Sequence, residues 1–278
     1  MKNKLLRTSA IVLSMATLLS VTACKLNNSP IIGKALDSVT GMPDETEARL
    51  TTSAENAIMA GKTKEALALY TKLYKENDTA SVSLNYAQLL RKTGKAKEAL
   101  SILKPFVVNG DGSLKDDAKP IMLNEYAAAN IELGHYSTAE MALQKVFKST
   151  DANGFYADAY DLHGVALDAQ GWHKEAEKDF RNALKIWKGD PTAVMNNLGL
   201  CLAAQGMFDE SLTWLRQALI KAPHDTEIAR NIDMVSKLRK EFVPTAPISI
   251  TAPPAAKAKH KAHPTHKPPH KKKLSKKS

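Results

Sequence analysis

Two stretches of the chain can be superimposed: GVALDAQGWHKEAEKDFRNAL, residues 164–184, and GLCLAAQGMFDESLTWLRQAL, residues 199–219. Each stretch begins with glycine, has a second glycine seven residues later, and has a small residue five positions after that. Each then has a bulky apolar residue four positions further on and closes with Ala-Leu. A spacing that recurs after 35 residues indicates a structural repeat.

The same spacing continues towards the N-terminus. The second glycine recurs as Gly61, Gly94, Gly134, Gly171 and Gly206. The small residue that follows each of them is Ala66, Ala99, Ala139, Ala176 or Ser211. The small residue that precedes each of them is Ala54, Ala87, Ala127, Gly164 or Gly199. The bulky apolar position is taken by Tyr70, Leu103, Leu143, Phe180 and Leu215, and a second apolar position by Leu73, Phe106, Val146, Ala183 and Ala218.

This pattern resembles the tetratricopeptide repeat (TPR), in which each unit is a pair of antiparallel helices. The small residues let the two helix axes approach to about 8–10 Å, and the glycine between them ends the first helix in a left-handed conformation. We therefore expect an all-α, right-handed superhelical solenoid of about five helix pairs over residues 45–242. The segment from His224 to Phe242 has one apolar face and predicts a C-terminal capping helix.

Local signals refine this expectation. Pro105 falls inside a predicted second helix and should shorten or kink it. The NGDGS segment, residues 109–113, predicts the loop that lengthens the second unit. Asp190 followed by Pro191 predicts a helix start with proline at its first position. Ser137 with Glu140 predicts a capping box.

The N-terminal segment, residues 1–23, has the pattern of an export signal. Three basic residues precede a short apolar run that is too short for a comfortable membrane-spanning helix. The tetrapeptide Val21–Cys24 resembles the bacterial lipobox, which implies cleavage before Cys24, lipidation of Cys24 and a linker over residues 24–44. The alternative is an ordinary signal peptide with an incidental cysteine. The residue after the cysteine is Lys25, whereas lipoproteins of this kind that stay in the inner membrane have aspartate there. The resemblance therefore implies a lipid anchor in the outer membrane, facing the periplasm of a Gram-negative bacterium.

The C-terminal segment, residues 243–278, is rich in proline, alanine, lysine and histidine and predicts a disordered basic tail. The lysines between Lys257 and Lys277 favour contact with a polyanion, with a purely solubilising tail as the equal alternative. The tail histidines have no closed-site spacing, so no metal or other cofactor is expected. The whole-chain net charge of +10 is concentrated in the two ends, and the near-neutral remainder does not indicate specific nucleic-acid binding.

Stacked helix pairs offer a concave groove lined by the first helices, which suits a protein partner. The polar residues expected there are Glu55, Gln88, Asn124, Glu132, Asp158, Asp161, Asp168 and Asn196. Their acidic excess favours a peptide with basic or amide groups, and the alternative is a merely solvated helix face. No nucleophile with a base and no phosphate-binding loop is evident, so we expect no enzyme and no catalytic residues. Cys201 is expected to be a small buried apolar side chain.

The runs at residues 163–186, 196–219 and 227–235 together resemble the TadD-like lipoproteins of tight-adherence (Flp) pilus assembly. This resemblance spans residues 154–235 and implies a non-enzymatic factor that helps a pilus secretin to assemble in the outer membrane. The basic tail departs from that family. Two alternatives remain open: a periplasmic adaptor for cell-wall enzymes or for another pilus system, and a structural lipoprotein that tethers the outer membrane to the cell wall through its tail.

Overall fold

A computed structural model describes residues 45–152 and 154–242 of the chain. The predicted signal peptide, Cys24, the linker and the basic tail lie outside the described residues. Eleven helices fill the described part. They are α3 (Glu45–Met59), α4 (Thr63–Glu76), α5 (Ala80–Lys92), α6 (Ala96–Val107), α7 (Pro120–Glu132), α8 (Tyr136–Lys148), α9 (Tyr156–Ala169), α10 (His173–Ile186), α11 (Thr192–Ala204), α12 (Phe208–Lys221) and α13 (Thr226–Phe242).

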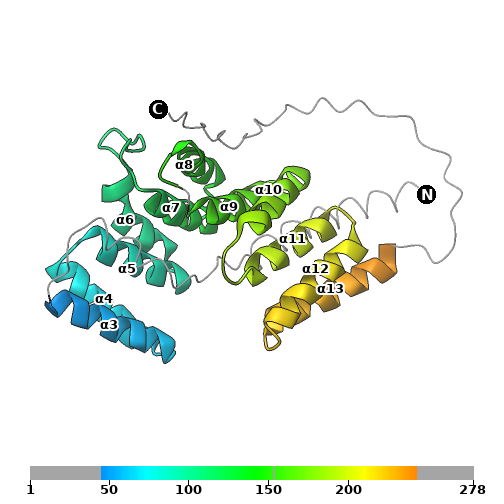
Figure 1. Cartoon of the computed structure of the whole chain (residues 1–278), viewed down its shortest axis with the longest axis horizontal. Helices are drawn as coiled ribbons and strands as arrows, with labels where there is room; N and C mark the ends of the chain where they lie inside the picture. The colour runs from blue at the N-terminus through cyan, green and yellow to red at the C-terminus, as the bar shows by residue number, and fades with distance from the viewer. Residues whose placement is uncertain (1–44, 153, 243–278) are drawn as a thin grey trace, which may run out of the picture.

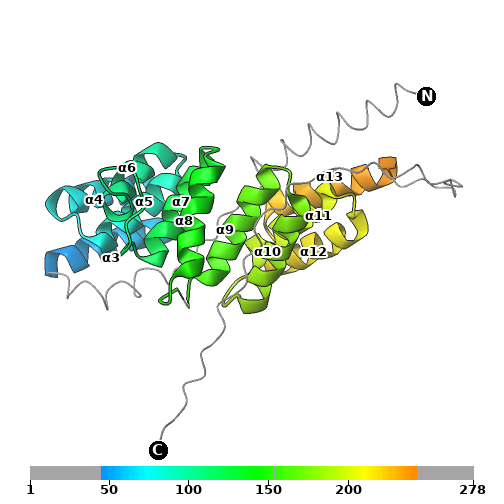
Figure 2. The same ribbon diagram turned by 90° about the horizontal axis from the view of Figure 1, so that it is seen from above.

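The helices pack as sequential pairs, α3 with α4 through α11 with α12, and the pairs follow one another along an arc (Figure 1). The first helices α5, α7, α9 and α11 also contact one another in order, and so form one continuous layer. In Figure 2, α9 lies between α8 on one side and α10 on the other, near the middle of the array. This arrangement confirms the all-α tetratricopeptide-repeat solenoid expected from the spacing. No helix in the described ranges is both long enough and apolar enough to cross a bilayer.

Each helix pair turns at the glycine that the sequence pattern identified. Gly94, for example, has a φ of 78°, a left-handed conformation that residues with a Cβ rarely adopt. Behind it, Lys95 N donates a hydrogen bond to Leu90 O over 2.9 Å, which closes the end of α5. The same backbone bond and a positive φ recur at the other four turns, so one local device sets all five hairpins.

The small residues of the pattern lie where the two helices of a pair meet. Ala66, Ala99, Ala139, Ala176 and Ser211 are completely buried. Their partners on the first helices are buried as well, and in the last two pairs the partner is a glycine. A Cβ on Gly164 would lie 2.8 Å from Cε1 of Phe180, and one on Gly199 would lie 2.7 Å from Cγ of Leu215. The hydroxyl of Ser211 donates to Gly199 O over 2.6 Å, which joins α12 directly to the backbone of α11.

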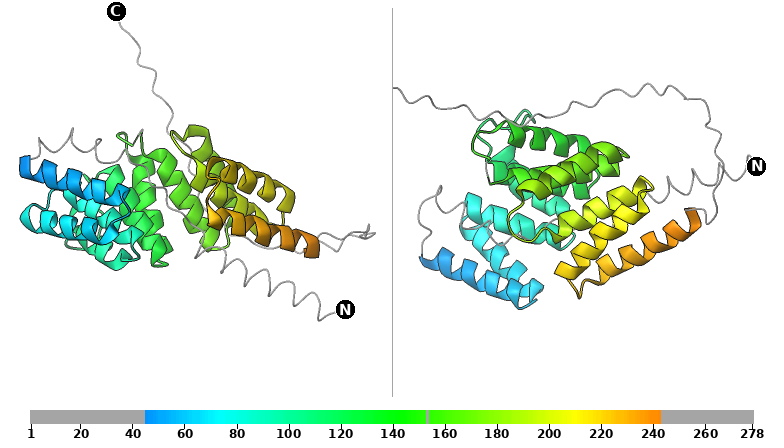
Figure 3. Two further views of the ribbon diagram at one scale, coloured as in Figure 1. Left: turned by 90° about the horizontal axis from the view of Figure 1, so that it is seen from below. Right: turned by 45° about the vertical axis from the view of Figure 1, so that its right-hand side comes forward.

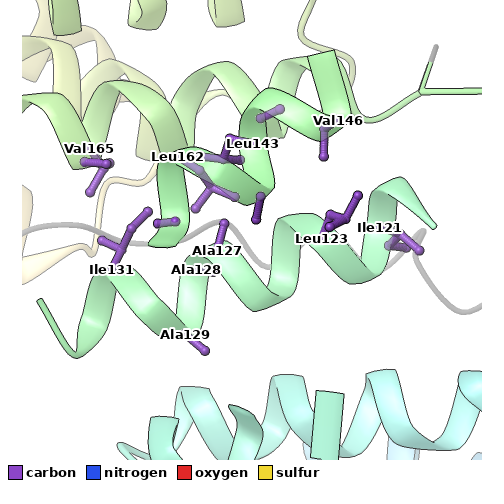
Figure 4. Packing of buried hydrophobic residues seen from close by; sticks show 14 of the residues in the cluster. Ile121, Leu123, Ala127, Ala128, Ala129, Ile131, Leu143, Val146, Leu162 and Val165 are labelled. Atoms are coloured by element: carbon purple, nitrogen blue, oxygen red, sulfur yellow. The ribbon is translucent and has the colours of Figure 1, made fainter. Parts of the chain in front are cut away.

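The main core runs along the middle of the array. Figure 4 shows Leu123 and Ala127 of α7 pointing towards α8, where Leu143 and Val146 meet them. Ala129, on the opposite side of α7, is also fully buried. Because α7 is apolar on both sides, it packs against its own partner helix and against the neighbouring pairs at once.

The second pair departs from the regular pattern. Phe106, expected at the second apolar position, is only half-buried, and Val107 beside it is completely buried. Pro105 lies inside α6, which at 12 residues is shorter than α4, α8, α10 and α12. Proline removes one backbone hydrogen bond and displaces the helix around it, so the buried position moves by one residue. The 109–113 loop follows, closed by a bridge between Val108 and Leu114.

The last helix covers the end of the array. Figure 3 shows α13 beside α12, and its Ile228, Val235 and Leu238 are buried. Asp225 Oδ1 accepts hydrogen bonds from the N–H groups of Glu227 and Ile228, as a helix-capping side chain does. The capping helix expected from the sequence is therefore present in the described residues.

Two expected helix starts are wrong in detail. Helix α8 begins at Tyr136 and shows no side-chain cap, so Ser137 is inside the helix and the capping box is not formed. The left-handed turn at Gly134 leads directly into α8 and leaves no extended residue to act as the cap. Helix α11 begins at Thr192, so Pro191 precedes its first residue. Asp190 Oδ1 nevertheless accepts from Thr192 N over 3.0 Å.

Candidate partner-binding face

The predicted groove residues all lie on first helices, and we call the surface they occupy the first-helix face. Their burial differs strongly along the array. Glu55 on α3 is exposed, and Gln88 on α5 is half-buried. The buried members are Asn124 on α7, Asp161 on α9 and Asn196 on α11. Polar groups inside a protein are costly unless they are hydrogen-bonded, so the buried members need partners.

Two separate side-chain hydrogen bonds link α11 to α9 and to α13. Asn197 Nδ2 donates to Asp161 Oδ1 over 3.1 Å and so connects α11 to α9. Asn231 Nδ2 donates to Asn196 Oδ1 over 2.9 Å and connects α13 to α11. The structure thus brings Asp161 and Asn196 into one polar strip that also contains Asn197 and Asn231. We call these four residues the polar strip.

Asp158 lies beside this strip, one turn before Asp161 on α9. Burial raises the pKa of Asp158 to about 6. Burial also raises the pKa of Asp161 to about 7, and the charge of Asp158 adds to that increase while Asn197 opposes it. Both carboxyl groups therefore change protonation state near neutral pH. A cation that binds beside them would favour their ionised forms.

Two buried amide oxygens on the face accept no hydrogen bond from the described residues: Oδ1 of Asn124 and Oδ1 of Asn197. Their amide nitrogens are both used, by Phe155 O at 3.1 Å for Asn124 and by Asp161 for Asn197. An acceptor without a donor is unfavourable by about 1–3 kcal/mol. Both oxygens are shielded from solvent, so a ligand would reach them only if neighbouring side chains moved.

Glu132 is engaged by an ion-pair cluster that the sequence analysis did not identify. Arg91 is buried and its Nε lies 2.5 Å from Oε1 of Glu125, while its Nη1 lies 2.7 Å from Oε1 of Glu132. The pKa of Glu132 is raised by desolvation, which the nearby Arg91 partly opposes. Burial also lowers the pKa of Lys92 next to it. This cluster joins α5 to α7, so Glu132 has a structural partner in the protein itself.

The remaining predicted residues lie apart from the polar strip. Asp168, at the end of α9, lies 2.6 Å from Nδ1 of His173 through its Oδ1. Glu55 and Gln88 belong to the first two pairs and make no contact with the polar strip. Of the eight predicted residues, Asp158, Asp161 and Asn196 therefore lie at or beside the polar strip. Asn124 is bonded to Phe155, which directly precedes α9. The other four, Glu55, Gln88, Glu132 and Asp168, lie elsewhere on the first helices.

The missed residues carry a signal in the spacing. The pairs Asn196–Asn231, Asp161–Asn197 and Arg91–Glu125 are separated by 35, 36 and 34 residues. The separation of Asn196 and Asn231 equals the 35 residues between Gly171 and Gly206, and that of Asp161 and Asn197 differs from it by one residue. Arg91 and Glu125 occupy different positions in their units, three residues before Gly94 and nine before Gly134. Scanning for polar residues one repeat apart would therefore have indicated the first two pairs but not the Arg91–Glu125 pair.

The described residues provide no assembly for nucleophilic catalysis. Burial raises the pKa of the Cys201 thiol, and the charge of Asp168 raises it further, so the reactive thiolate is disfavoured. His163 lies 2.6 Å from Asp179 in a buried contact between α9 and α10. Proteins with this fold generally act as non-enzymatic scaffolds, and the arrangement here suits the holding of a partner.

The helix pairs, the five glycine turns and the polar first-helix face together define a tetratricopeptide-repeat scaffold, a class that mediates contacts between proteins. The tetratricopeptide repeat family model matches residues 162–226. The comparison with curated proteins finds no match.

Solved structures share the fold at low sequence identity. TTC0263, a thermophilic TPR protein of Thermus thermophilus, is 20% identical, has a TM-score of 0.57, and is matched over 69% of this chain and 99% of its own. Cut9–Hcn1, an APC/C hetero-tetramer, is 16% identical with a TM-score of 0.58 over 80% of this chain and 41% of that one. MamA is 21% identical with a TM-score of 0.44, over 74% of this chain and 100% of its own.

Proposed function

We propose that the protein is a lipid-anchored scaffold of the outer membrane that binds a protein partner on its first-helix face and assists assembly of a Flp/Tad-type pilus secretin. The repeat fold and the absence of a catalytic assembly in the described residues support a scaffold. The lipobox at Cys24 supports the anchor. The resemblance of residues 154–235 to the TadD-like lipoproteins supports the pilus system.

The observation that carries the binding proposal is the chemistry of the face around the polar strip. Asp158 is half-buried on α9 and lies one turn from the buried Asp161, and the Oδ1 atoms of Asn124 and Asn197 are buried without a donor among the described residues. All four groups are hydrogen-bond acceptors when the carboxyls are ionised. Asp158 is the member of this group that a partner can reach, and a partner segment that carries a lysine or arginine would pair with its carboxylate. A cationic side chain would also draw the proton from these carboxyls, so binding should strengthen as pH rises through about 6 to 7.

The proposal can be tested with a purified Flp/Tad secretin and the full-length protein in detergent. Asp158→Asn keeps the shape of the side chain and removes its charge from the first-helix face. Asp209→Asn makes the same change on α12, where Asp209 is exposed and pairs with Arg239 at 2.7 Å. We expect Asp158→Asn to weaken binding about tenfold, as the loss of a charge-assisted hydrogen bond does. Asp209→Asn should leave the affinity unchanged.

Different results would separate the alternatives. Secretin binding that both variants retain would contradict the use of the first-helix face. Absence of secretin binding, together with retention of cell-wall material that depends on residues 243–278, would favour the tether. Absence of secretin binding together with capture of a purified cell-wall hydrolase that Asp158→Asn abolishes would favour the periplasmic adaptor.

A further inference from the structure

Three side chains with metal-binding chemistry meet where the fourth and fifth helix pairs join. Asp168 comes from the end of α9, His173 from the start of α10 and Cys201 from α11. One ligand atom of each lies within 4.8 Å of the other two. Cys201 is far from the other two in the sequence, so only the packing of one repeat on the next creates this cluster.

We propose that Asp168, His173 and Cys201 form a Zn²⁺ site that fastens the fourth repeat to the fifth. Zn²⁺ accepts thiolate, imidazole and carboxylate ligands together, whereas Mg²⁺ and Ca²⁺ prefer oxygen ligands alone. The site is separate from the polar strip, although Asp168 also belongs to the first-helix face, and its metal binding does not depend on the proposed partner.

The distances between the three ligand atoms would fit tetrahedral Zn²⁺ coordination after small movements of the side chains. Zn²⁺ bonds of about 2.0–2.3 Å place the ligand atoms of a tetrahedral site roughly 3.5 Å apart. The oxygen of Asp168 and Nδ1 of His173 are 2.6 Å apart, held by the hydrogen bond that the metal would replace. Asp168 and His173 are 15% and 20% exposed, so an ion can reach them from solvent. Sγ of Cys201 is buried beneath them.

A fourth ligand would have to come from a nearby carboxylate or from water. Glu177 lies one turn after His173 on α10, and its Oε2 accepts from Gln205 Nε2 over 3.0 Å. The same Gln205 nitrogen lies 3.8 Å from Sγ of Cys201, so Glu177 is close to the thiol. Glu177 or a water can occupy the fourth position. Binding requires the thiol to give up its proton to solvent, and the charge of the ion compensates for two carboxylates and a thiolate at one place.

A second His–Asp pair provides a matched comparison within the same repeat. His163 and Asp179 also approach to 2.6 Å between Nδ1 and Oδ2. Among the described residues, Asp168, His173 and Cys201 form the only group of three or more side chains whose ligand atoms are close enough to share a metal ion. A variant of Asp179 therefore changes a pair of the same kind without touching the proposed site.

The test uses the full chain carrying Cys24→Ser, in which Cys201 is the only cysteine. Co²⁺ replaces Zn²⁺ as the probe because a Co²⁺–thiolate bond gives a near-ultraviolet charge-transfer band, which histidines of the tail cannot produce. We expect one equivalent of Co²⁺ to produce the band and Zn²⁺ to remove it. Asp168→Asn and His173→Ala should each weaken Co²⁺ binding by about tenfold or more, and Asp179→Asn should leave it unchanged.

Cys201→Ser should abolish the band while circular dichroism shows the helices intact. Zn²⁺ should also raise the melting temperature of the Cys24→Ser chain and leave that of its Cys201→Ser derivative unchanged. A Cys24→Ser chain that gives no band overturns the proposal. So does a band whose Co²⁺ affinity is the same in the Asp168→Asn, His173→Ala and unsubstituted chains.

Discussion

Gly164 shows how one missing methyl group sets the distance between two helices. Glycine in a helix interior costs about 1 kcal/mol relative to alanine, yet Phe180 is completely packed against this position. In Gly164→Ala the new Cβ would meet the ring at 2.8 Å, and overpacking of this kind costs about 1–3 kcal/mol. After the gain in helix propensity we expect a net loss of about 1 kcal/mol in the free energy of unfolding, measured by urea titration.

Gly154 provides the control for this substitution. A Cβ there would meet nothing within 4 Å, and its φ lies outside the left-handed range. Gly154→Ala should therefore leave the unfolding free energy unchanged or slightly higher. If Gly164→Ala proves as stable as Gly154→Ala, the close contact with Phe180 does not limit the helix spacing.

Asp161 makes the stability of the fold depend on pH. Its pKa rises from an ordinary value near 3.8 to about 7 in the folded protein. The folded state therefore holds the proton more tightly than the unfolded chain, and its contribution to stability is present below about pH 4 and is lost as pH rises through about 7. Asp161→Asn should remove this loss and raise the unfolding free energy at pH 8 by on the order of 2 kcal/mol relative to the unsubstituted chain.

Urea titrations at pH 5 and pH 8 on both proteins check this expectation. The advantage of Asp161→Asn should be larger at pH 8, because only there is the original carboxylate forced to ionise while buried. An advantage that is equal at both pH values would show that Asp161 does not titrate in this interval. Asp209→Asn, exposed on α12, should show no advantage at either pH.

At the scale of the elements, the repeat pattern predicted the turns and the close helix contacts, which depend on local sterics. It did not predict the features that depend on how one element packs against another. The five glycine turns and the buried small residues follow from spacing alone, because a left-handed turn and a close helix contact admit few residue types. The exchange of Phe106 for Val107 could not be predicted, since it results from how α6 adjusts to Pro105 in three dimensions. The capping box at Ser137 failed because the preceding turn determines where α8 begins.

The candidate face shows the same division. The sequence pattern placed Asp158, Asp161 and Asn196 on first helices, where they are. It did not reveal that Asp161 bonds to Asn197, because that contact needs the register between two repeats and not only the positions within one. The proposed metal site does not follow from the repeat pattern either, because the neighbours of Cys201 come from the preceding helix pair.

Helix α13 acts as a cap for α12, which gives a prediction at this scale. Val235 packs with Leu200, Leu212 and Leu215, and Asn231 bonds to Asn196. Deleting residues 226–278 exposes this cluster and removes the hydrogen bond that Asn231 donates to Asn196. We expect the amides of α11 and α12 to lose hydrogen-exchange protection, while those of α7 and α8 keep it, because repeat arrays transmit stability mainly to neighbours.

Deletion of residues 243–278 alone is the matched control, since it leaves α13 in place. Protection in α11 and α12 should then equal that of the full chain. Equal protection in both truncated proteins would show that α13 does not stabilise the last pair. Loss of protection throughout the longer deletion, α7 and α8 included, would show that the array unfolds as one unit.

The whole molecule combines an elongated helical scaffold with an N-terminal segment that contains Cys24 and a basic C-terminal segment. Its buried residues form a main cluster from α5 to α11, a second around α3 and α4, and a third between α11 and α13. Each pair rests mainly on its neighbours, and the first helices form one continuous layer in which Asn124, Asp161 and Asn196 are buried and Asp158 is half-buried. A scaffold of this kind needs a separate means of attachment to act at a membrane, and the proposed attachment point is Cys24.

The anchor can be tested with the two cysteines of the chain. Acyl chains contribute about 0.8 kcal/mol per buried methylene, and more than one chain gives stable attachment. In a Gram-negative host that expresses the full-length gene, the unsubstituted protein should sediment with the outer membrane and Cys24→Ser should appear in a soluble fraction. Cys201→Ala, which changes a buried cysteine on α11, should stay with the membrane. If Cys24→Ser also sediments with the membrane and is released by removing residues 243–278, the basic tail and not a lipid attaches the scaffold.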